Sequence, residues 1–118
     1  MATILITGSN KGIGMAAAIA FGKAGHNVAA TMRNPALATV LMNSINSEKL
    51  PIKVFRLDVD SDESVSSTIQ KITKEMGPID VLVNNAGIER LGPVEEVAIF
   101  DYRKVMETNY FGVIRCVQ

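Results

Sequence analysis

The sequence has few of the residues that build covalent or metal-based structure. It contains one cysteine, one histidine and no tryptophan among 118 residues. The single cysteine, Cys116, excludes a disulfide within the chain, and one histidine with one cysteine cannot form a Cys/His metal cluster. We therefore predict no metal site, and the absence of cysteine pairs favours a reducing, cytoplasmic environment.

Long hydrophobic runs and an excess of one charge are also missing. The longest apolar run, residues 15–21, is far shorter than a membrane-spanning helix requires. Twelve acidic and twelve basic side chains balance, so the net charge gives no reason to expect nucleic acid or a membrane surface as a partner. No basic segment precedes an apolar stretch at the N-terminus, so we predict no signal peptide. The remaining composition, 47% hydrophobic, is typical of one soluble globular domain.

What the sequence does contain is a regular alternation of short apolar runs with amphipathic stretches. The apolar runs predict four buried strands, at residues 2–6, 27–32, 53–57 and 79–83. Apolar residues at helical spacing predict helices over residues 13–24, about 37–45, from a capping box of Asp60 and Glu63 to Met76, and from Ile99 to the end.

This alternation predicts an α/β fold, a Rossmann-type doubly wound parallel sheet with four strands in the order 3-2-1-4. In such a sheet the ligand crevice lies at the carboxyl ends of the strands, where the strand order reverses. The crevice is therefore expected between the first and fourth strands.

A glycine-rich stretch, Thr7 to Gly14, joins the first strand to the first helix and reads TGSNKGIG. Glycines here permit a sharp turn and a close approach of the backbone, and the helix start presents N–H groups and a positive dipole to a phosphate. Gly12, Gly14 and Ala17 also fit the dinucleotide fingerprint. The alternative is an ordinary strand-to-helix turn. The predicted pyrophosphate-binding residues are Gly8, Ser9, Asn10, Lys11, Gly12, Ile13 and Gly14.

Four motifs in this order resemble the short-chain dehydrogenase/reductase (SDR) family over essentially the whole chain. They are the glycine turn, Asp58 after the third strand, Asn84-Asn85-Ala86-Gly87 after the fourth, and Asn109 in the last helix. The resemblance implies that residues 1–118 form the NADP(H)-binding Rossmann half-domain of an oxidoreductase. Such an enzyme transfers a hydride between a nicotinamide dinucleotide and a small alcohol or carbonyl substrate, and is expected to be a homo-oligomer.

The resemblance also implies roles for individual cofactor-binding residues. Asp58 would accept from the adenine amino group, with Val59 along the ring edge. Asn85, Ala86 and Gly87 would line the ribose and nicotinamide side. Considered without the family, Asp58 is equally an acid before a helix, and the Asn-Asn-Ala-Gly stretch is a turn.

Two further asparagines receive roles from the resemblance. Asn84 would tie neighbouring strands together through its amide. Asn109 would be the catalytic residue that organises a proton-relay water. From the residues alone, Asn109 is a structural amide that must be paired, because it lies on a largely apolar helix.

Cofactor choice depends on the end of the second strand, where an NAD site carries an acidic residue for the ribose 2′-hydroxyl. Met32 and Arg33 occupy this place, and Lys11 adds a cation within the glycine turn. Two cations without a carboxylate favour the 2′-phosphate of NADP(H) over NAD(H). Each cation taken singly is equally a solvated surface charge.

The chain departs from the family in its catalytic residues. SDR catalysis uses a Ser and a Tyr-x-x-x-Lys pair, but Tyr102 is followed four places later by Met106, and Tyr110 by Ile114. We therefore expect an N-terminal half, truncated before the remaining strands and inactive by itself. An unpaired fourth strand and an uncovered last helix would make it unstable or prone to association. The alternative is a non-catalytic nucleotide-binding fragment or module.

Overall fold

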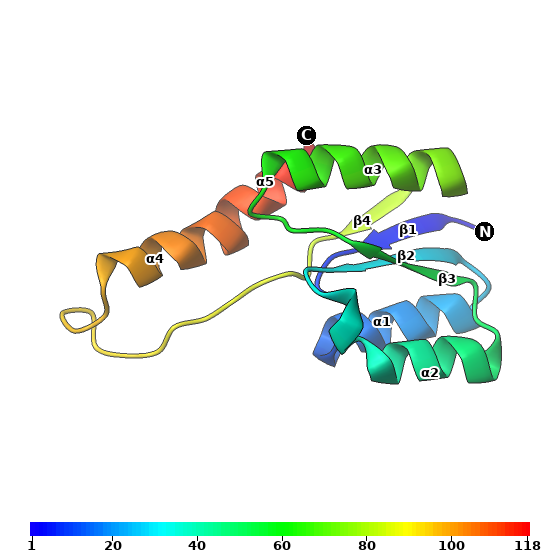
Figure 1. The fold of residues 1–118 in the computed structure, drawn as a ribbon, viewed down its shortest axis with the longest axis horizontal. Helices are drawn as coiled ribbons and strands as arrows, with labels where there is room; N and C mark the ends of the chain where they lie inside the picture. The colour runs from blue at the N-terminus through cyan, green and yellow to red at the C-terminus, as the bar shows by residue number, and fades with distance from the viewer.

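Four parallel strands in the order β3-β2-β1-β4 form the centre of the molecule (Figure 1). The computed structural model describes residues 1–118 and confirms the predicted strand order and Rossmann-type arrangement. The elements are β1 (Thr3–Ile6), α1 (Gly12–Lys23), β2 (Asn27–Met32), the 3-10 turn η1 (Pro35–Leu37), α2 (Thr39–Glu48), β3 (Ile52–Arg56), α3 (Asp62–Met76), β4 (Val81–Val83), α4 (Ile99–Met106), the π turn η2 (Glu107–Phe111) and α5 (Gly112–Val117).

Both faces of the sheet are covered, which explains why its two central strands, β1 and β2, are buried along almost their whole length. Ile4 and Ile6 of β1 pack on the face covered by α1 and α2, whereas Leu5 between them packs against Ile72 of α3. Figure 1 shows α1 and α2 on one side of the sheet and α3 on the other. This two-sided core fixes the strand ends from which the functional residues project.

The N-terminus of α3 differs from the predicted capping box. Ser61, not Asp60, is the N-cap, and its hydroxyl accepts from the Ser64 N–H at 3.1 Å. The carboxylate of Asp60 instead accepts from the Thr108 hydroxyl at 2.7 Å. The sequence pattern was off by one residue because Ser and Asp are both good N-caps and stand side by side here.

The predicted single helix from Ile99 onward is interrupted by the π turn η2. Its apolar spacing carries on through the turn and no glycine or proline marks the start of η2, so the sequence offers no signal for it. A π turn widens the helix locally and is frequent at functional positions. This one carries Thr108 and Asn109. None of the helices is both long and apolar enough to cross a membrane.

Apolar surface is exposed at β4 and along the continuous helical segment formed by α4, η2 and α5 (residues 99–117), here called the α4–α5 rod. β4 pairs only with β1. α4 extends away from the rest of the molecule (Figure 1), and the whole chain, including α4, measures 49 × 27 × 21 Å. Exposed apolar side chains on the rod are Ile99, Phe100, Tyr102, Met106, Tyr110, Phe111, Ile114 and Val117. For these 118 residues β4 is an edge strand of the sheet. The uncovered last helix, and the resulting instability or association, stay predictions.

Cys116 on α5 is buried against Leu57, Val59 and Val65. Burial raises the pKa of its thiol, and the nearby charge of Arg115 offsets this only in part. Because the thiolate is the reactive form, we expect iodoacetamide at pH 8 to label native protein at least about tenfold more slowly than unfolded protein. Intact-mass measurements with and without guanidinium give both rates; equal rates would contradict the buried position of α5.

Candidate functional site

A cavity of about 360 Å³ lies at the carboxyl ends of the strands, beside the point between β1 and β4 where the strand order reverses. Its lining residues are Gly8, Asn10, Lys11, Met32, Arg33, Asn34, Leu37, Leu57, Val59, Asp60, Ala86, Gly87, Ile88 and Thr108. The glycine turn and the segment after β4 therefore meet at one cavity, as the fold predicts. Seven of the predicted cofactor-binding residues line it: Gly8, Asn10, Lys11, Arg33, Val59, Ala86 and Gly87.

The two motifs are joined by hydrogen bonds through Thr7 and Asn85. The Thr7 hydroxyl accepts from the backbone N–H groups of Asn85 at 3.0 Å and Ala86 at 2.9 Å. The Asn85 side-chain amide donates to the Gly8 carbonyl at 3.0 Å. The amide that ties the strand ends together is therefore that of Asn85, and the prediction for Asn84, which is exposed, is wrong. Neighbouring residues point to opposite sides, so the sequence alone could not decide between them.

Gly8 and Gly14 are the glycines that this junction requires. Gly8 has a φ of +65°, and a Cβ there would lie 2.9 Å from the Ala86 Cα. A Cβ on Gly14 would collide with the Gly8 carbonyl and the Asn85 side chain. Absence of side chains thus allows the turn, the helix start and the segment after β4 to touch.

The first turn of α1 has N–H groups that are free to bind an anion. The N–H groups of Gly12, Ile13 and Gly14 donate no hydrogen bond, and Lys11 at the N-cap places no side-chain acceptor there. No acidic residue occupies the first turn. Ser9 is buried just before it, and its hydroxyl donates to the Ile6 carbonyl at 2.8 Å. A rigid turn with free donors and a helix dipole is suited to a phosphate.

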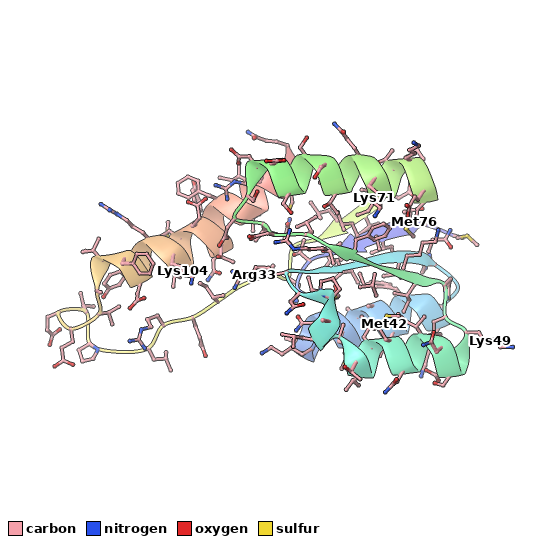
Figure 2. All side chains as sticks on the ribbon, viewed as in Figure 1. Arg33, Met42, Lys49, Lys71, Met76 and Lys104 are labelled. Carbon is pink, nitrogen blue, oxygen red and sulfur yellow. The ribbon has the colours of Figure 1, made fainter.

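An unanticipated carboxylate stands near the two cations. Arg33 Nη1 lies 3.9 Å from Asp60 Oδ2, and both residues line the cavity together with Lys11. Figure 2 shows Arg33 at the end of the sheet that faces α4. The carboxylate of Asp58 instead accepts from the Asp60 backbone N–H at 3.0 Å. The sequence analysis assigned Asp60 to a helix cap and not to the cavity, because the family pattern directs attention to the end of the second strand for the residues that select the cofactor.

Asn109 binds the segment after β4 with both ends of its amide. Its Oδ1 accepts from the Ile88 N–H at 2.8 Å, and its Nδ2 donates to the Ile88 carbonyl at 2.7 Å. A Cβ on Gly87 would approach Asn109 Oδ1 to 3.3 Å. Asn109 therefore fastens the π turn to the wall of the cavity, and the expected pairing of this amide is confirmed.

Arg115 on α5 ties this helix to the segment after β3 and to the π turn. It donates to the Val59 carbonyl at 2.9 Å and to Asp62 at 2.5 Å, and it pairs with Glu107. The hydrogen bond with Glu107 is the main cause that raises the pKa of Arg115, although burial acts against it. Sequence reasoning missed Arg115 and Thr108 and gave Asp60 a different role, since their contacts with one another's segments join residues 48 to 56 positions apart along the chain.

Comparison with known proteins identifies the family. The model of the short chain dehydrogenase family matches residues 2–118. The chain belongs to the short-chain dehydrogenase family. This assignment agrees with the glycine turn, the Asn-Asn-Ala-Gly segment and the cavity between them.

Three members of the family illustrate the similarity. Gluconate 5-dehydrogenase of Gluconobacter oxydans is 34% identical over 112 residues, which cover 95% of this chain and 44% of that protein. The NADPH-dependent pterin aldehyde reductase of Arabidopsis thaliana is 37% identical, over 94% of this chain and 46% of the reductase. A gluconate 5-dehydrogenase from Burkholderia cenocepacia, solved with NADP and tartrate, superposes with a TM-score of 0.89 at 32% identity, covering 99% of this chain and 46% of that one.

The chain spans less than half of the length of these family members. Relatives with different substrates share the region that the chain covers.

Proposed function

We propose that the protein carrying this chain is an NAD(P)(H)-dependent oxidoreductase that transfers a hydride between nicotinamide and an alcohol or carbonyl substrate. Residues 1–118 form its cofactor-binding half-domain, and NADP(H) is favoured over NAD(H). The observation that carries the proposal is the free first turn of α1, which directly follows the cavity-lining residues Asn10 and Lys11, with Arg33 on the same cavity. We further propose that it acts in the cytoplasm as a homo-oligomer.

The residues of the cavity fit a dinucleotide. The N–H groups of Gly12, Ile13 and Gly14 suit the pyrophosphate, and the close junction at Gly8 keeps side chains out of its path. Val59 offers an apolar wall, and Asp58 a carboxylate, at the end of β3 for the adenine side. The bound cofactor would supply the hydride chemistry, and these residues would hold it in place.

On the nicotinamide side, the proposal gives the segment after β4 the task of positioning. Asn85, Ala86 and Gly87 would line this side of the cofactor. Their backbone is held by the Thr7 hydroxyl at one end and by Asn109 at Ile88 on the other. Such preorganisation is what hydride transfer requires, because small errors in orientation reduce the rate strongly. Asn109 is proposed as the catalytic residue of this half.

The preference for NADP(H) is supported by charge. Arg33 follows β2 at the place where an NAD-specific site has an acid, and Lys11 stands across the same cavity. Two relatives are in keeping with it: the Arabidopsis reductase is named NADPH-dependent, and the Burkholderia dehydrogenase was solved with NADP.

Replacing Arg33 by glutamine tests the cofactor assignment. In the full protein, R33Q is expected to weaken NADPH binding by about 10- to 100-fold, since a charge-assisted bond to the 2′-phosphate is lost. NADH lacks this phosphate, so its dissociation constant should change little. Titration followed by nicotinamide fluorescence measures both.

The exposed Arg103 of α4 provides the matched control, because R103Q removes the same charge away from the cavity. It should leave both dissociation constants unchanged. Equal weakening of NADPH and NADH by R33Q would contradict the NADP(H) assignment.

The second candidate is a nucleotide-binding module without catalysis. It rests on the same cavity and free N–H groups, which would hold a dinucleotide with or without catalysis. If the full protein binds NADPH tightly but reduces no member of a panel of aldehydes and ketones, this candidate replaces the enzyme.

A further inference from the structure

The carboxylate of Asp60 faces the cation that the proposed 2′-phosphate would bind. Its Oδ2 lies 3.9 Å from Arg33 Nη1, which is an ion pair without a direct hydrogen bond. Both side chains line the cavity. A carboxylate in this place attracts the guanidinium and repels a phosphate, so it acts against NADP(H) from the end of the third strand.

Of the two partners, Asp60 is the one held in place. Its Oδ1 accepts from the Thr108 hydroxyl at 2.7 Å, and its backbone N–H donates to Asp58 at 3.0 Å. The Asp60 side chain is 21% exposed, whereas that of Arg33 is 53% exposed and has no other ion pair or side-chain hydrogen bond. Arg33 can therefore change partners, while the carboxylate stays where it is.

We propose that Asp60 is a specificity-determining residue that competes with the 2′-phosphate for Arg33 and so moderates the preference for NADP(H). This inference rests on the proposed function. A long, half-exposed ion pair contributes little to fixing the position of Arg33. The loss of competition upon neutralising Asp60 should therefore outweigh any loss of positioning, and NADP(H) should bind more tightly.

Thr108 connects the carboxylate of Asp60 to the π turn η2. Its hydroxyl holds the carboxylate, and the next residue, Asn109, fastens the same turn to Ile88. The side chain that sets the position of Asp60 is thus carried by the element that borders the proposed nicotinamide side of the cavity.

The test is D60N in the full protein, combined with R33Q in a double-mutant cycle. Asparagine keeps an oxygen for the Thr108 hydroxyl and loses the charge. We expect D60N to tighten NADPH binding by about 1.5-fold to fivefold at low salt, the range that corresponds to one exposed ion pair. NADH should bind unchanged, and the gain should vanish in the R33Q background and shrink as salt is added. E75Q, which neutralises an exposed acid on α3, is the matched control and should change neither affinity.

Several outcomes would overturn this inference while leaving the proposed function intact. They are unchanged or weaker NADPH binding by D60N, an equal gain for NADH, and a gain that persists in R33Q. Far-ultraviolet circular dichroism verifies that each variant is folded, and D60S, which also removes the charge and keeps an oxygen for the Thr108 hydroxyl, repeats the test if D60N does not fold. A wild-type protein that binds neither dinucleotide would overturn the proposed function together with this inference.

Discussion

Replacing Gly14 by valine is expected to abolish dinucleotide binding, with a loss of at least about 100-fold in NADPH affinity. The new Cβ would collide with the Gly8 carbonyl and the Asn85 side chain, so the glycine turn and the segment after β4 could not both keep their places. Overpacking of this kind costs about 1–3 kcal/mol in stability. The free N–H groups of the first turn of α1 would also be displaced, so they could no longer bind one phosphate together. Fluorescence titration with NADPH, together with thermal unfolding, measures both effects.

The structure offers a close control on the same helix. Ala16 is exposed two residues further along α1, so A16V adds the same β-branched side chain without a collision. It should reduce stability only by the difference in helix propensity, about 0.6 kcal/mol, and should leave NADPH binding intact. Because the collision already involves the Cβ, G14A should show most of the loss of NADPH affinity. Full NADPH affinity in G14A would show that the junction is looser than described.

Replacing Asn109 by alanine should reduce turnover of a carbonyl substrate about 100-fold while changing NADPH affinity less than fivefold. Two effects combine. The substitution removes both hydrogen bonds to Ile88, which together stabilise the folded protein by about 1–3 kcal/mol, and it removes the amide to which we assign a role in catalysis. Steady-state kinetics on the carbonyl compound that the wild-type protein reduces, alongside NADPH titration, separate the two constants.

Asn43, exposed on α2 away from the cavity, supplies the matched control N43A, which should behave like wild type. A loss of stability in N109A with an undiminished rate would assign Asn109 a purely structural role. A parallel loss of NADPH affinity and rate would instead mean that the segment after β4 serves cofactor binding as a whole.

The sequence was sufficient for the fold because each local signal agreed with the others. The strands at Thr3–Ile6 and Asn27–Met32 are apolar on both faces, and helices separate them, which leaves few parallel arrangements. The position of the crevice followed from topology, since the strand order reverses between β1 and β4.

The contacts within the site could be predicted less well. Which of two adjacent asparagines faces Gly8 depends on the orientation of one peptide unit, and this selected Asn85 over Asn84. The ion pair of Arg33 with Asp60 joins the ends of two strands, and no periodicity records which way a long side chain turns. The π turn at Glu107–Phe111 is likewise set by what the helix must contact on either side, Ile88 and Asp60, rather than by its own residues.

The order of the strands in the sheet also governs when each part of the cavity can form as the chain is synthesised. β1 can pair with β2 once its neighbour has emerged, but the Thr7 hydroxyl must wait for Asn85, 78 residues later. Closing so long a loop carries a large entropic cost before any contact repays it. Until β4 docks, the glycine turn has no partner at Gly8 and its N–H groups have no opposite wall. The turn thus leaves the ribosome well before Asn85 and is completed only after β4 has been made.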